Sequence, residues 1–182
     1  MRFFHLLKIV LISTMFMNST NAQTVVNFEK DVNDTNWHIV DDVVMGGRSS
    51  GSFRVEHNNY AIFSGSVSLE NNGGFSAVKY DLEATKITAN SRIRICLKGD
   101  EKIYQFRIKS IKNQRHSYIT TIQTTGDWQE VIISLKDLYP TFRGNKLDLP
   151  NFDHNSIAEI WFLIGNKKTE TFQLLLKSIE II

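Results

Sequence analysis

Histidine side chains can act in catalysis and bind metal ions, and the histidines downstream of residue 22 are scattered along the chain. The positions are His38, His57, His116 and His154, and none forms the H-x-x-x-H or H-E-x-x-H spacing of a zinc site. The single cysteine, Cys96, excludes an internal disulfide and a cysteine-rich zinc site. These residues therefore predict no zinc centre.

Carboxylates leave two kinds of chemistry open. Acids in the loops of a β-sandwich can bind a structural Ca²⁺, and Glu29, Asp41, Asp42 and Asp153 are eligible, although no spacing selects a set. A pair of acids can also cleave a glycosidic bond, but the sequence marks no pair. We assign no catalytic residue, no metal and no cofactor, and we keep an unrecognised hydrolase as the weakest hypothesis.

The segment from Trp37 to Gly51 has the most unusual composition, with paired aspartates, paired glycines and paired serines. Paired glycines permit positive φ or close approach of another backbone, and successive amides there can form an anion-binding nest. The opposing interpretation is a structural loop whose amides are satisfied by Asp42 or Ser49. The candidate binding residues in this segment are Trp37, Asp42, Met45, Gly46, Gly47 and Ser49.

A second segment, Ser64–Ser76, contains the run Asn-Asn-Gly-Gly, which favours a tight hairpin connection. The alternative is a polar loop rim, because amide and hydroxyl groups of this kind recognise sugar hydroxyls. The candidate binding residues in this segment are Asn71, Asn72, Gly73, Gly74 and Phe75.

A third segment, Tyr139–Asn145, combines aromatic residues, an arginine and a glycine. Arginine and aromatic residues are enriched at recognition surfaces. The equal alternative is a structural contact between the guanidinium and an aromatic ring. The candidate binding residues in this segment are Phe142, Arg143 and Gly144.

The N-terminus has the layout of a secretory signal peptide, with Arg2 and Lys8 before the apolar stretch Ile9–Met17 and small residues ending at Ala22. We predict cleavage after Ala22, export to the periplasm or medium, and a single domain over 23–182 with no stable membrane anchor. Residues 1–22 hold two of the 21 basic residues and none of the 19 acids, so the mature chain is neutral. Neutrality argues against a nucleic-acid partner.

Alternation of apolar and polar residues dominates the mature chain and predicts antiparallel strands with one buried and one solvated face. About ten such strands, separated by turn signals, predict an all-β sandwich or barrel. On these strands Arg92, Arg94, Arg107 and Lys109 could form a basic stripe, although a solvated face balanced by acids is favoured. The predicted strands are Thr24–Phe28, Ser52–Glu56, Tyr60–Val67, Phe75–Asp81, Arg92–Lys98, Tyr104–Lys109, Ser117–Gln123, Val131–Leu135, Ala158–Gly165 and Phe172–Ile182. Short helical turns are expected at Asp34–Trp37, Leu135–Leu138 and Asn155–Ala158.

Five sequence blocks resemble the signature of the complex I intermediate-associated protein 30 family, in that family's order and across roughly residues 25–182. The blocks are Asp42–Ser49, Gly65–Phe75, Lys98–Asp100, Gly126–Trp128 and Pro140–Gly144. The resemblance implies an antiparallel jelly-roll β-sandwich of the galactose-binding-domain-like kind, with a non-catalytic binding or assembly role. Mitochondrial members are similar to chaperones that help assemble respiratory complex I, whereas the signal peptide predicts an exported, bacterial-type member.

The leading hypothesis is therefore a non-catalytic, chaperone-like domain that binds a protein partner in the cell envelope. Its predicted surface is formed by the three candidate segments. The alternative is a carbohydrate-binding module whose partner is a glycan.

Overall fold

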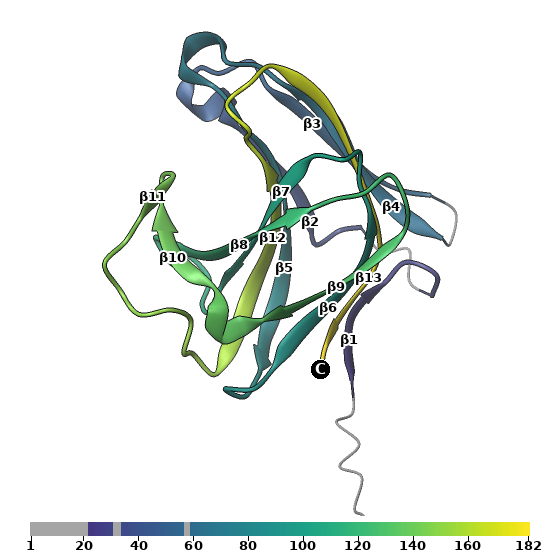
Figure 1. The fold of residues 1–182 in the computed structure, drawn as a ribbon, viewed down its shortest axis with the longest axis vertical. Coiled ribbons are helices and arrows are strands. Elements are labelled where there is room, and N and C mark those ends of the chain that lie inside the picture. The colour runs from purple at the N-terminus through teal and green to yellow at the C-terminus, as the bar shows by residue number, and fades with distance from the viewer. Residues whose placement is uncertain (1–21, 31–33, 57–58) are drawn as a thin grey trace, which may run out of the picture.

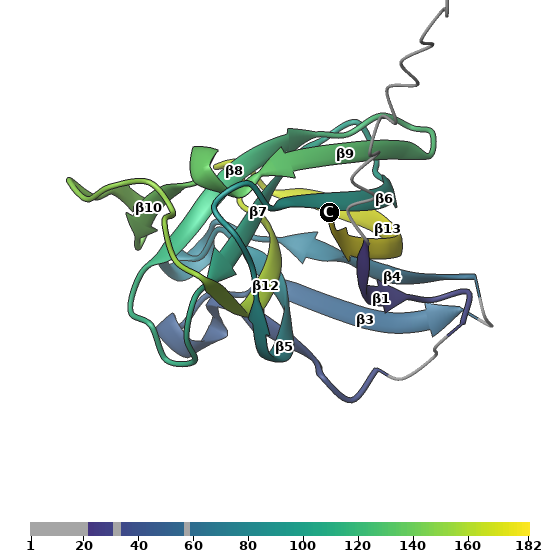
Figure 2. The same ribbon diagram turned by 90° about the horizontal axis from the view of Figure 1, so that it is seen from below.

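The computed structural model describes residues 22–30, 34–56 and 59–182, which form a sandwich of two antiparallel sheets (Figures 1 and 2). One sheet has six strands, in the order β3-β4-β13-β6-β9 with β1 paired to β13, and the other has seven, in the order β11-β10-β8-β7-β12-β5-β2. The six-stranded sheet contains β1 (Gln23–Asn27), β3 (Ser50–Glu56), β4 (Tyr60–Val67), β6 (Arg92–Lys98), β9 (Gln129–Ser134) and β13 (Glu170–Ile181). The seven-stranded sheet contains β2 (Trp37–Asp41), β5 (Ser76–Lys86), β7 (Ile103–Lys109), β8 (Ser117–Gln123), β10 (Tyr139–Phe142), β11 (Asn145–Lys146) and β12 (Ser156–Ile164). The short 3-10 helices are η1 (Asp42–Met45), η2 (Glu70–Asn72) and η3 (Leu135–Asp137).

The core fills the space between the two sheets and follows the alternation in the sequence. Phe63 comes from the six-stranded sheet, whereas Phe106 and Phe162 come from the seven-stranded one, and all three are fully buried. Burying a side chain of this size stabilises the fold by roughly 1.5–3 kcal/mol. The polar residues between these positions consequently face outward on both sheets.

The fold confirms the all-β prediction. The final segment is the long strand β13, as predicted, and it lies inside the six-stranded sheet with β4 and β1 on one edge and β6 on the other. The helical turn expected at Leu135–Leu138 is η3.

Two local expectations were wrong. The helical turn expected at Asn155–Ala158 is absent, because β12 begins at Ser156 and its pairing with β5 holds the segment extended. Trp37–Asp41 is the edge strand β2, which the search for strands missed because the neighbouring glycines suggested a loop. Residues 1–21, which contain most of the predicted signal peptide, lie outside the described part of the chain. No helix in the described part is long and apolar enough to cross a bilayer.

Candidate functional site

The first two candidate segments meet at one buried carboxylate, that of Asp42. Its Oδ1 accepts a hydrogen bond from the backbone N–H of Ser49 at 3.0 Å, and its Oδ2 accepts one from the Ser49 hydroxyl at 2.6 Å. Oδ2 also accepts from the backbone N–H groups of Gly74 at 2.6 Å and Phe75 at 3.2 Å. The carboxylate is fully buried and thereby joins two loops about thirty residues apart in sequence.

The glycines around Asp42 are required by space. A Cβ at Gly47 would lie 2.2 Å from Asp42 Oδ1, and one at Gly73 would lie 2.6 Å from Oδ2. Gly46 instead ends η1 with a φ of 88°, which glycine adopts without strain. We call Asp42, Gly47, Ser49 and residues 73–75 the Asp42 junction, which lies at one end of the sandwich (Figure 1).

Asp41 joins the same loops from the adjacent position. Its Oδ2 accepts from the backbone N–H of Gly51 at 2.9 Å, and its Oδ1 accepts from the hydroxyl of Ser76 at 2.6 Å. At Asp42, burial alone would raise the pKa, but the hydrogen bonds from Ser49, Gly74 and Phe75 outweigh it and lower the pKa below its ordinary value. The paired aspartates therefore hold backbone and hydroxyl groups of this chain in place.

The Asp42 junction corrects part of the predicted binding surface. The side chains of Trp37, Asp42 and Ser49 are buried and cannot be presented to a partner. Trp37 stacks in the core against Phe53, with ring centroids 4.6 Å apart. Met45 is the last residue of η1.

Part of the second candidate segment is exposed. Asn71 and Asn72 are exposed in η2 with φ values of 55° and 60°, and Phe75 is partly exposed. Their role in binding a partner stays a prediction.

Gly47 to Gly51 form a G-x-S-x-G pattern, which is the spacing around a catalytic serine. No catalytic residue was assigned from the sequence, and this pattern was not used there. In a nucleophile elbow the serine is exposed on a turn between a strand and a helix. Here Ser49 is buried, its hydroxyl is bound to Asp42, and the strand β3 follows. Ser49 is therefore a structural hydrogen-bond donor.

The third candidate segment does not join the Asp42 junction. Phe142 ends β10, and Arg143 and Gly144 form the turn to β11 with φ values of 49° and 81°. The guanidinium groups of Arg115 and Arg143 lie 4.6 and 5.4 Å from the Phe142 ring centroid. These contacts agree with the cation–π alternative for this segment.

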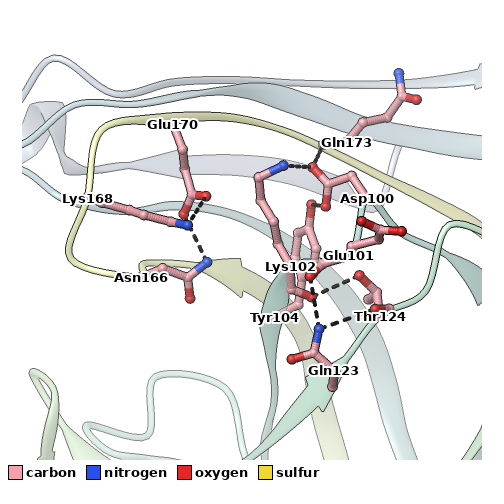
Figure 3. Close-up of polar contacts among 10 residues, drawn as sticks. All are labelled: Asp100, Glu101, Lys102, Tyr104, Gln123, Thr124, Asn166, Lys168, Glu170 and Gln173. Atoms are coloured by element: carbon pink, nitrogen blue, oxygen red, sulfur yellow. Dashed lines mark hydrogen bonds and ion pairs between the residues drawn. The ribbon is translucent and has the colours of Figure 1, made fainter.

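A second carboxylate, Asp100, lies in the turn between β6 and β7 and contacts the beginning of β13 (Figure 3). It accepts hydrogen bonds from the Tyr104 hydroxyl at 2.9 Å, from Lys102 Nζ at 2.6 Å and from the backbone N–H of Gln173 at 3.0 Å. A Cβ on the neighbouring Gly99 would lie 2.2 Å from the Thr124 hydroxyl oxygen. Burial, together with the charge of Asp100, raises the pKa of Tyr104, which stays a neutral donor.

The side chains that can bind a ligand lie elsewhere, on the outer face of the seven-stranded sheet. Residues directly opposite one another in an antiparallel sheet share a face. One cross-strand row is formed by His38, Lys79, Trp161, Arg107, Ile119 and Tyr139, from β2, β5, β12, β7, β8 and β10. The next row contains Asp81, Glu159 and Lys109. We call these nine residues, together with Gln105, the Trp161 face.

Trp161 is the partly exposed centre of this face. Its indole Nε1–H donates to Glu159 Oε2 at 2.9 Å, and Lys109 Nζ lies 3.1 Å from the same oxygen. The Nζ atoms of Lys109 and Lys79 lie 5.1 and 5.9 Å from the indole centroid. Because polar neighbours on both sides fix the indole, its orientation is set before any ligand arrives.

The other charges of the face are also organised. Lys79 Nζ lies 3.0 Å from Asp81 Oδ1, and His38 Nε2 lies 3.3 Å from Asp81 Oδ2. The guanidinium of Arg107 donates from both Nε and Nη2 to Gln105 Oε1. Burial lowers the pKa of Arg107 while Tyr139 acts to raise it, and an arginine remains charged at neutral pH.

Of this face, Arg107 and Lys109 were placed from the sequence in the possible basic stripe, and His38 and Tyr139 in the first and third candidate segments. The structure separates that stripe, because Arg92 and Arg94 lie on β6 in the other sheet. The remaining residues were missed because β5, β7 and β12 are distant in sequence and adjacent only in the fold. The available signal was Glu159, a charged residue two positions before Trp161 inside an otherwise apolar run. Within the described residues, no three His, Cys, Asp or Glu side chains gather closely enough to hold a metal ion.

Comparison with solved structures shows the same fold in carbohydrate-binding modules. A family 11 module from Clostridium thermocellum, solved with a β-1,3-1,4-mixed-linked tetrasaccharide, is 17% identical with a TM-score of 0.66, over 88% of this chain and 95% of that one. The family 11 module of the C. thermocellum cellulase Lic26A-Cel5E gives a TM-score of 0.67 at 17% identity, over 88% and 94%. An agarase, AgWH50C, gives 0.58 at 14% identity, over 88% of this chain and 24% of that one.

These likenesses confirm the jelly-roll sandwich. No curated protein sequence matches this chain. Residues 26–176 match the family model described as complex I intermediate-associated protein 30. Because this match spans most of its length, the chain belongs to the complex I intermediate-associated protein 30 family.

Proposed function

We propose that this chain is a non-catalytic carbohydrate-binding domain whose ligand lies on the Trp161 face. The observation that carries the proposal is a partly exposed, orientated indole at the centre of a sheet face on which most of the other side chains are polar. An aromatic ring offers an apolar plane on which the C–H face of a sugar packs. Specific recognition then needs a few placed polar groups beside it, and here Lys79, Arg107 and Gln105 provide them.

The fold supports this proposal. A family 11 module that was solved with a mixed-linked tetrasaccharide has the same sandwich. A sheet face also suits an extended polymer better than it suits a small molecule, because several strands contribute contacts along one row. Export, as the N-terminal sequence predicts, would bring the domain to polysaccharide outside the cytoplasm.

Asp81 and Glu159 are neighbours across β5 and β12, which bears on the hydrolase hypothesis. Each of these carboxylates is bound by a lysine, Lys79 or Lys109, at 3.0–3.1 Å. In this arrangement the acids hold the lysines and the indole in place. We therefore place them as positioning residues of a binding face, with no cleavage step.

The test is affinity electrophoresis in native gels that contain β-1,3-1,4-glucan, xyloglucan or polygalacturonate. We expect at least one polymer to retard the folded protein, and Trp161→Ala to reduce the affinity at least tenfold. Trp128→Ala is the matched control, because Trp128 is 42% exposed and precedes β9 in the other sheet. This control should bind like the unmodified protein. Denaturant unfolding of each variant separates lost binding from lost folding.

Retardation by no polymer would overturn the proposal, as would equal loss of binding in the Trp161 and Trp128 variants. Release of reducing ends during incubation would contradict the non-catalytic role. If Trp161→Ala is unstable, Trp161→Phe keeps an aromatic plane without the Nε1 donor and should retain part of the affinity. Crosslinking to an envelope protein without any glycan binding would favour the protein partner expected from the sequence.

A further inference from the structure

The charges of the Trp161 face do not balance, and the excess sits on one residue. Lys79 is paired with Asp81, and Lys109 with Glu159. Arg107 stands between Trp161 and Ile119 in the same row and has no carboxylate within ion-pair distance in the described part of the chain. Its polar partner is the neutral amide of Gln105.

The contact with Gln105 leaves one edge of the guanidinium unused. The side edge, Nε–H and one Nη2–H, points to Gln105 Oε1. Among the described residues no hydrogen bond engages the Nη1–H groups or the second Nη2–H, and these donors form the end-on fork that matches a planar oxyanion. Gln105 therefore fixes the plane of the fork while keeping its end free.

A partly buried cation without an anionic partner costs free energy, because desolvation is not repaid by an ion pair. The pairing of both neighbouring lysines shows that carboxylates are available on this face, yet none is supplied to Arg107. A ligand that brings its own anion would complete the arrangement. The adjacent indole of Trp161 would pack against the same ligand's ring.

We propose that the ligand is an acidic polysaccharide whose anionic group binds the free end of Arg107 while a sugar ring packs on Trp161. This inference rests on the proposed function and names its substrate class. The anion can be a uronate carboxylate or a sulfate ester, since both offer two oxygens to the fork. A neutral glycan would leave Arg107 without a counter-charge.

The experiment compares polymers that differ only in charge. Isothermal titration is run with polygalacturonate and its fully methyl-esterified form, and with dextran sulfate and dextran. We expect at least tenfold tighter binding to the charged member of one pair. The carboxylate pair and the sulfate pair distinguish the two sources of the anion.

The variants assign that preference to Arg107. Arg107→Gln should remove the charge preference, whereas Arg92→Gln should keep it. The control is matched because Arg92 is an exposed arginine on β6 of the other sheet. Arg107→Lys should retain part of the preference, because it keeps the charge and loses the fork.

Binding of a neutral polymer at least as tight as its charged counterpart would overturn this inference and leave the proposed function standing. A preference unchanged in Arg107→Gln, or lost equally in Arg92→Gln, would also overturn it. No binding to any charged or neutral polymer would overturn both.

Discussion

The Asp42 junction and the Trp161 face both organise charged side chains, but they satisfy them differently. At the junction, short side chains and backbone N–H groups supply the hydrogen bonds, and the Asp42 carboxylate is fully enclosed. On the face, long side chains meet each other in partly exposed pairs, and Arg107 keeps free donors. Hydrogen-bonding groups that are satisfied within the chain stabilise the fold, whereas donors without a partner are available to a ligand.

The residues that resemble the family signature and the residues proposed to bind the ligand belong to different parts of the molecule. The blocks that resemble the family signature include Asp42–Ser49, Gly65–Phe75 and Lys98–Asp100. The structure uses Asp42, Ser49, Gly73 and Asp100 of these blocks to close turns. The ten residues of the Trp161 face all lie outside the five blocks, so the resemblance to the family says nothing about the ligand of this face.

The largest effect in this comparison is expected for Asp42→Asn. The amide replaces an oxygen that accepts hydrogen bonds with an NH₂ group that faces the same donors, and the free energy of unfolding should fall by about 3–5 kcal/mol. Denaturant unfolding followed by tryptophan fluorescence measures the change. Asp148→Asn is the matched control at an exposed aspartate and should change stability by less than about 0.5 kcal/mol. Equal stabilities of the two variants would contradict a structural role for the junction.

A smaller effect is expected for Gly47→Ala. The new Cβ would lie 2.2 Å from Asp42 Oδ1 and would displace the carboxylate from its donors. Overpacking of this kind costs about 1–3 kcal/mol. Gly126→Ala provides the control, because the nearest atom to its Cβ is 3.8 Å away. A Gly47 variant as stable as the Gly126 variant would show that the junction tolerates a shift.

The smallest effect is expected in how the stability of the fold depends on acidic pH. Because the pKa of Asp42 is lowered on folding, its ionised form contributes stability that is present above the ordinary pKa of 3.8 and is lost as the pH falls through the lowered value. Unfolding measured between about pH 6 and pH 2 should show a shallower loss of stability on acidification in Asp42→Asn than in the unmodified protein. Parallel pH profiles would contradict this origin of the acid dependence.

Most of the fold was predictable from alternation, because a strand with one buried face repeats every two residues. Tyr60–Val67, Arg92–Lys98 and Ser117–Gln123 coincide with β4, β6 and β8. The strand β2 was missed because the neighbouring glycines suggested a loop and its partner strand β5 is distant in sequence. Alternation does not indicate that the first two candidate segments converge, because their meeting at Asp42 depends on the fold.

The Trp161 face was not predictable from the sequence in the same way. Its rows combine strands from residue 38 to residue 161, and the order of strands in the sheet decides which side chains become neighbours. Each strand alone shows ordinary charged positions on a solvated side. Only the register brings an indole, two neutralised lysines and a free guanidinium fork together.

The most direct test of the account is a ¹H–¹⁵N NMR titration of the unmodified protein with oligosaccharides of the polymer that retards it. The account predicts that the amides of Lys79, Arg107 and Trp161 and the Trp161 indole shift together, while those of Ser49, Gly74 and Phe75 stay unchanged. Shifts concentrated at the Asp42 junction, with the Trp161 indole unmoved, would contradict it.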